Sequence, residues 1–219
     1  MSSLEPDQTD TTTKPVRPPS LTRDIVTTGV FTALYFVVMA IVGQLSALIP
    51  ILQVLAPFYI PILCGIPFML FLTRVHRFGM ITAMGWIIGL LLMLTNAAIL
   101  ALILGLVLAP LADWIAHTGK YRRWSLLVVS YILVGEISIG MVGLLFFQRQ
   151  AVLNRIGQHH DAAWVAQIAH LTPPWMLYVM IGELAVGAII GAFLGRGIFR
   201  KHYRYLAPTS AQPGGPAQP

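Results

Sequence analysis

The chain has 219 residues, of which 57% are hydrophobic and 10% charged, and its formal net charge is +6. Soluble domains carry about a quarter charged residues, so this chain lacks the polar surface that a water-soluble core of its size requires. Its basic residues form short clusters between apolar blocks, with no base-stacking motif, which argues against nucleic-acid binding. The composition indicates an integral membrane protein with the lipid bilayer as its solvent.

Six apolar blocks follow one another along the chain, each about long enough to cross roughly 30 Å of hydrocarbon as a helix. We predict an all-α bundle of six transmembrane helices within 21–205. Three prolines in the second span, Pro57, Pro61 and Pro67, predict a kinked or broken helix. Residues 1–20 and 206–219 are predicted to be disordered cytoplasmic tails. The six ranges are 21–49, 51–72, 78–94, 98–117, 125–147 and 175–199.

The distribution of basic residues predicts the orientation of the bundle. Arg149 and Arg155 are the only two of the 14 Lys and Arg residues that fall on one side of the alternating spans. Because positively charged loops stay in the cytoplasm, the loops near Arg74 and Lys120 and both termini are predicted to be cytoplasmic. The chain is therefore predicted to be a multi-pass protein of a bacterial plasma membrane.

The outward segment 148–172 is the one long connection among short turns. Asp161 is placed to cap a helix that carries an apolar stripe of Trp164, Val165, Ile168 and Leu171. Such a helix either lies on the membrane surface or folds over the bundle as a lid. We favour the lid, because a single long loop among short ones often carries function.

Small residues form a ladder on the first span, at Gly29, Ala33, Ala40 and Ala47. Spacings of four and seven place them on one helix face, where small side chains allow close approach of another helix in lipid. The face serves either as a contact inside the bundle or as a docking surface for another membrane protein.

Two carboxyl groups fall inside predicted spans. Glu136 precedes Gly140 and Gly143, and Glu183 precedes a glycine at every fourth position, from Gly187 to Gly195. Acids within a membrane are costly and so are functional candidates. By helical rise they lie roughly 16 Å and 13 Å from the outer ends of adjacent antiparallel spans, so they are potential neighbours. Each is protonated and bridging two helices, hydrogen-bonded to polar neighbours, or paired with a cationic ligand.

Other polar and aromatic side chains are predicted near the outer face, and they are candidates for binding a ligand. The histidines are either metal or chelate ligands or solvated loop residues, and the aromatic residues are alternatively interfacial anchors. No catalytic or nucleotide-binding motif is present, so we expect no enzyme activity, no cofactor and no metal site. The polar and aromatic residues predicted near the outer face are Gln44, Gln53, Asn96, His159, His160, His170, Trp175 and Tyr178.

Three stretches resemble a known family: LTRDIVTTGVFTALYF at 21–36, GIPFMLFLT at 65–73, and LADWIA at 111–116 followed by Gly119-Lys120-Tyr121. They are similar to the substrate-binding S components of energy-coupling factor (ECF) ABC transporters, and most of all to the MptD, or Trep_Strep, branch. The resemblance covers residues 20–205 and agrees with six helices and cytoplasmic termini.

The resemblance implies that the chain captures a micronutrient, a vitamin or metal-related compound, outside the cell. It then docks on a transmembrane coupling subunit that is driven by two cytoplasmic ATPases. Gly29 and Ala33 match the small residues that contact the coupling subunit in this family, with Ala40 on the same face. The family's ligand region lies near the outer side, where Glu136, Glu183, Trp175, Tyr178, Asn96, Gln44 and His170 are predicted.

Two other functions stay open at this point. One is a self-sufficient, proton-coupled transporter with Glu136 and Glu183 as the relay, although no pair of inverted repeats with matching broken helices is evident. The other is a membrane enzyme or assembly factor, although no cluster of nucleophile, base and oxyanion donors is present.

Overall fold

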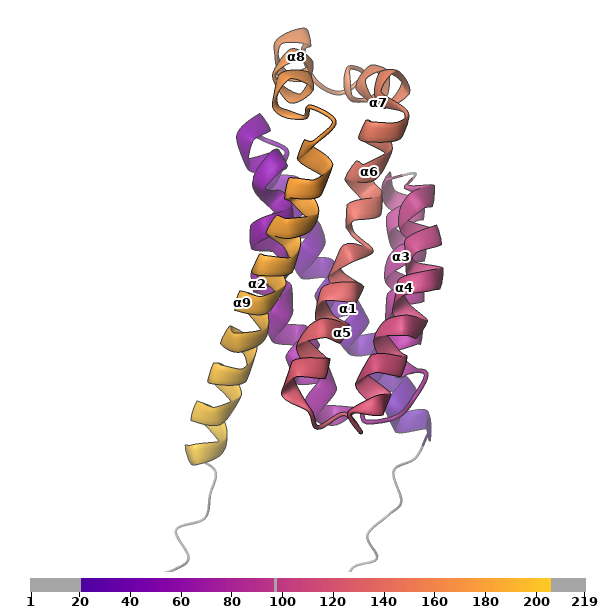
Figure 1. Cartoon of the computed structure of the whole chain (residues 1–219), viewed down its shortest axis with the longest axis vertical. Helices are drawn as coiled ribbons and strands as arrows, with labels where there is room; N and C mark the ends of the chain where they lie inside the picture. The colour runs from indigo at the N-terminus through magenta and orange to yellow at the C-terminus, as the bar shows by residue number, and fades with distance from the viewer. Residues whose placement is uncertain (1–20, 97, 206–219) are drawn as a thin grey trace, which may run out of the picture.

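The computed structural model describes residues 21–96 and 98–205, which form nine helices and no strand (Figure 1). The predicted disordered tails lie outside the described residues. The described chain begins and ends at one end of the bundle, here called the terminal end, and α7 and α8 lie across the opposite cap end (Figure 1). The helices are α1 (Leu21–Ser46), α2 (Pro50–Arg74), α3 (Met80–Asn96), α4 (Ile99–Thr118), α5 (Trp124–Glu136), α6 (Ile139–Phe147), α7 (Arg149–Ile156), α8 (Ala162–Leu171) and α9 (Met176–Tyr205).

Several of these helices have the length and surface of membrane spans. Among the described residues, α1, α2, α4 and α9 are long and apolar enough to cross a membrane, and α5 with α6 makes a fifth, bent candidate. Their outward side chains are apolar: Val30 is 61% exposed and Val107 is 62% exposed. α3 has 17 residues, about 25 Å by helical rise, at the short end of the range for a span. The all-α class is thus confirmed for the described residues, while the count of six spans and the cytoplasmic termini stay predictions.

The predicted span over 125–147 is divided into α5 and α6, which meet at 49°. At the junction the backbone hydrogen bonds tighten to a three-residue spacing, with Ser138 N–H donating to the Gly135 carbonyl at 2.9 Å. Ser138 Oγ also donates to that carbonyl, at 2.7 Å. A side chain that competes for a helix carbonyl in this way bends the helix. The bend brings α6 so close to α4 that a methyl group at Gly140 would lie 2.3 Å from Ala101 N.

The glycine stripe on α9 packs against α2. A methyl group at Gly187 would lie 2.0 Å from the Phe58 carbonyl oxygen, and one at Gly191 would lie 2.4 Å from that of Pro61. Only glycine allows two helix backbones to approach this closely. Of the two outcomes predicted from the prolines of α2, the break does not occur, because α2 is one continuous helix.

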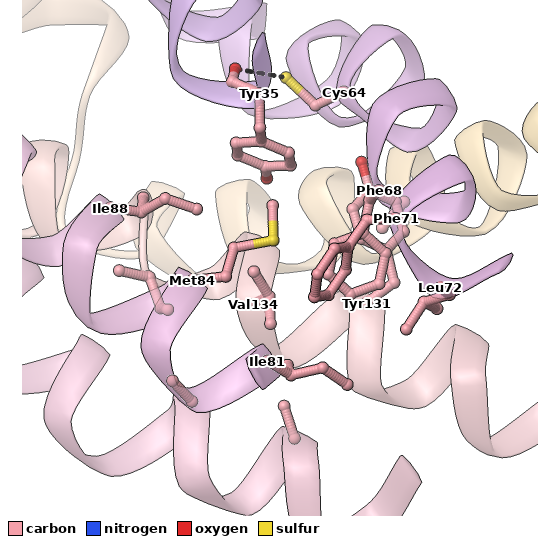
Figure 2. Close-up of a cluster of buried hydrophobic side chains, with 14 of the residues drawn as sticks. Tyr35, Cys64, Phe68, Phe71, Leu72, Ile81, Met84, Ile88, Tyr131 and Val134 are labelled. Atoms are coloured by element: carbon pink, nitrogen blue, oxygen red, sulfur yellow. Dashed lines mark hydrogen bonds between the residues drawn. The ribbon is translucent and has the colours of Figure 1, made fainter. Parts of the chain in front are cut away.

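A core of large side chains joins α1, α2, α3 and α5 (Figure 2). The rings of Phe68 and Tyr131 stack with their centroids 4.7 Å apart, and the Tyr131 hydroxyl donates to the Pro61 carbonyl. Cys64 is fully buried and lies beside Tyr35. This core fixes the bundle below the cap end.

At the terminal end, the fully buried Asp113 of α4 joins three segments. Its Oδ2 accepts from Gly79 N–H at 2.7 Å and from Thr82 N–H at 3.1 Å, at the start of α3. Its Oδ1 accepts from the Tyr121 hydroxyl at 2.7 Å. Burial, and then the hydrogen bond to Asp113, raise the pKa of Tyr121 well above the ordinary tyrosine value. The hydrogen bonds to Asp113 therefore connect the loop before α5 to α3 and α4.

The cap end is held together by local and long-range hydrogen bonds. The Asp161 side chain accepts from Trp164 N–H at 2.7 Å, which confirms the predicted helix cap. Arg149, at the start of α7, donates to the carbonyls of Ala169 and Thr172 at the end of α8. A cation there also complements the negative end of the helix dipole. The segment 148–172, which was predicted as a lid, therefore forms two helices, α7 and α8, that are hydrogen-bonded to each other and lie over the bundle (Figure 1).

Candidate functional site

Two adjoining cavities lie at the cap end. The bundle cavity has a volume of about 340 Å³ and is bounded by α1, α2, α3 and α6. The roof cavity, of about 230 Å³, continues from it beneath α7 and α8. The bundle cavity alone is within the range of about 300–1,000 Å³ that is usual for small-molecule sites. The side chains that border both cavities are Ala47, Gln53, Asn96, Met141 and Val142.

Amide and hydroxyl groups supply the polar part of the bundle cavity. Gln44, Gln53, Thr95, Asn96 and Ser138 border it, and the rest of its lining is apolar apart from backbone atoms. Gln53 Oε1 is buried without a hydrogen-bond partner in the described chain. Because a buried polar atom without a partner is costly, this amide is available to a bound molecule.

The roof cavity adds a cation and two stacked rings. The imidazole of His160 lies on the indole of Trp164, with centroids 4.0 Å apart and planes inclined by 13°. Trp164 Nε1 is buried and donates to no described acceptor. Arg155 of α7 borders the same cavity. No Asp or Glu lines either cavity, so the fixed charge of the site is positive.

The structure brings some of the predicted ligand residues to these cavities and leaves others elsewhere. Gln44 and Asn96 border the bundle cavity. His170 borders a separate surface groove, beside Pro50 at the start of α2. Trp175 is 62% exposed, Tyr178 is 77% exposed, and neither borders the bundle cavity or the roof cavity. Their exposure fits the alternative reading of interfacial aromatic residues.

The two predicted carboxyl groups are half-buried and border neither cavity. Their helices do meet beside them, because a methyl group at Gly135 would lie 2.9 Å from Leu184 Cδ2. Glu136 lies at the bend, and its carboxyl group makes no hydrogen bond or ion pair with the described chain. Glu183 Oε2 is buried without a partner there. Neither carboxyl therefore bridges two helices by a hydrogen bond within the described residues.

The small residues of α1 divide between two environments. Gly29 and Ala33 are exposed, and a methyl group at Gly29 would meet nothing within 4 Å. Ala40 and Ala47 instead border the bundle cavity. The first part of the ladder is thus free for contact with another helix, while the later part belongs to the cavity wall.

Sequence reasoning missed Arg155, Trp164 and Ser138 as lining residues, and it missed Asp113 as a buried acid. The apolar stripe and cap of α8 predicted a helix around Trp164, but not that this residue would border a cavity or that its indole N–H would lack a partner. Asp113 lies within a predicted span. The criterion that selected the two glutamates, an acidic residue inside a span, was therefore sufficient to find it.

Comparisons with known proteins place the chain in a family. No curated protein and no solved structure shows significant similarity to it. The sequence family described as hypothetical bacterial integral membrane protein (Trep_Strep) matches residues 22–204, which include every described helix except the ends of α1 and α9. The apolar outward surface of the helices agrees with that description. The chain belongs to the Trep_Strep family of bacterial integral membrane proteins.

Proposed function

We propose that the chain is the substrate-capture subunit of an ATP-driven uptake system of the ECF type in the bacterial plasma membrane. The observation that carries this proposal is a roofed, partly polar cavity at one end of an otherwise apolar bundle. A subunit that removes a dilute small molecule from water needs such a pocket, with polar groups that orient the ligand and a cover that excludes solvent.

The orientation follows from the basic loops. Arg74 and Arg77 flank the α2–α3 connection, and Lys120 and Arg122 lie in the α4–α5 connection, both at the terminal end (Figure 1). The positive-inside rule assigns that end to the cytoplasm and the cap end to the exterior. We include α3 and the bent α5–α6 pair as crossings, which makes six and leaves both termini inside.

The partner in this proposal is a transmembrane coupling subunit carrying two cytoplasmic ATPases. Gly29 and Ala33 support it, since they form an exposed small-residue surface on a helix that is weakly buried in its own bundle. Close helix approach in lipid needs such a surface. ATP hydrolysis belongs to the partner subunits, and the chain itself performs no catalytic step.

Co-purification tests the proposal. The tagged chain is expressed with the ECF module of its own bacterium and isolated from membranes, and we expect the coupling subunit and both ATPases to be recovered with it. Gly29→Leu is expected to abolish that recovery, because the side chain fills the contact surface. Gly182→Leu, which also points into open space but lies on α9, is the matched control and should retain the partners. Failure of the unaltered chain to bind any such module contradicts the proposal.

A second candidate is proton-coupled transport without ATP, favoured by the buried, unpartnered Glu183 Oε2. Uptake into liposomes that contain the purified chain alone, driven by a pH gradient and lost in Glu183→Gln, would establish it in place of the first.

A further inference from the structure

The charge and hydrogen-bonding groups of the cap-end cavities point to a class of ligand, an inference that rests on the proposed function. Arg155 is the one Lys or Arg that borders them within the described chain, and its guanidinium makes no ion pair or hydrogen bond there. No acidic side chain lines either cavity. A cationic ligand would meet an uncompensated positive charge, whereas an anionic group would gain a charge-assisted hydrogen bond.

The groups without partners define a second requirement. Trp164 borders the roof cavity, and its Nε1 is a buried donor without a partner in the described chain; Gln53 borders both cavities, and its Oε1 is a buried acceptor without one. Each is left unsatisfied by the described protein, so a ligand that supplies the matching acceptor and donor removes a desolvation cost. Two unsatisfied polar groups on residues that border adjoining cavities are evidence of a binding site beyond the shape of the cavities.

The remaining walls are apolar. Ile156 and Ile168 border the roof cavity, and Met141 and Val142 border both cavities. They favour an apolar or aromatic body over a sugar-like one, because burial of many hydroxyl groups here would leave most of them unpaired. The stacked rings of His160 and Trp164 also border the roof cavity.

We infer that the cap-end cavities bind a small amphipathic anion, with its acidic group beside Arg155, an acceptor on the Trp164 N–H and its apolar body in the bundle cavity. The two predicted glutamates are not part of this site.

Equilibrium dialysis of the full chain in phosphatidylcholine nanodiscs tests this inference, with empty discs as the blank. Three probes share one ring system and differ in charge: 2-naphthoate, 2-naphthamide and 2-naphthylmethylammonium. We expect affinity to fall in that order. Arg155→Gln should weaken 2-naphthoate by about tenfold and leave 2-naphthamide within about twofold, as for loss of one charge-assisted hydrogen bond. Arg122→Gln removes the same charge from the α4–α5 connection and should change neither probe.

Trp164→Phe keeps an aromatic side chain, though a smaller one, and removes the N–H, so it should weaken 2-naphthoate by about threefold or more. Trp175→Phe, an exposed position away from both cavities, is its control. The inference is overturned if 2-naphthoate does not bind, if the cation binds as well as the anion, or if Arg155→Gln affects all three probes equally. The assay needs no ATPase, so this failure is distinct from failure of the chain to recruit a coupling module.

Discussion

Asp113 carries the clearest single-residue prediction, because its carboxylate accepts four hydrogen bonds in a fully buried position. Asp113→Ala leaves the N–H groups of Gly79 and Thr82 and the Tyr121 hydroxyl unpaired, and we expect it to lower the free energy of unfolding by about 3 kcal/mol. Tyr121→Phe removes one of these bonds and should cost about 1 kcal/mol. Denaturation of both variants in mixed micelles measures the difference, and equal losses would contradict the described network.

At the scale of elements, the α2–α9 interface decides how far the last helix can approach the bundle. Gly191→Ala places a methyl group 2.4 Å from the Pro61 carbonyl oxygen, so the helices must separate, and we expect a loss of about 1–3 kcal/mol in unfolding free energy. Gly182→Ala lies on the same helix but meets nothing within 4 Å, and it should be neutral or stabilising by up to about 1 kcal/mol because alanine favours helix. The same micelle denaturation compares them. If both variants gain stability alike, the close approach of α9 to α2 is refuted.

The whole molecule has a testable orientation. In a Cys64→Ala background, which removes the only cysteine, Gln158→Cys reports the α7–α8 connection and Arg122→Cys the α4–α5 connection. A membrane-impermeant maleimide applied to intact cells should label position 158 and spare position 122, because the cap end faces outward. Labelling of both positions after lysis is the control for accessibility. The reverse pattern in intact cells would place the cavities on the cytoplasmic side and remove the basis for capture from outside.

The sequence alone was enough to predict the helices of this protein and the cap of α8. It also predicted the apolar, membrane-facing surface of the bundle. These properties depend on local signals: runs of apolar residues, the Asp161 cap three residues before Trp164, and clusters of Lys and Arg at the ends of spans. The small-residue ladder on α1 could also be recognised in the sequence. Its division between an exposed half and a cavity wall could not be predicted.

The tertiary structure alone decided which polar groups share a site. Gln53 of α2, Ser138 of the α5–α6 junction and Trp164 of α8 border adjoining cavities at the cap end because the chain bends at Ser138 and α8 folds over the bundle. Whether a side chain reaches a cavity depends on the rotation and register of its helix, which are fixed by backbone contacts such as those of Gly140 and Gly191. No local pattern contains that information, which is why Glu136 and Glu183 stood out in the sequence and yet border neither cavity.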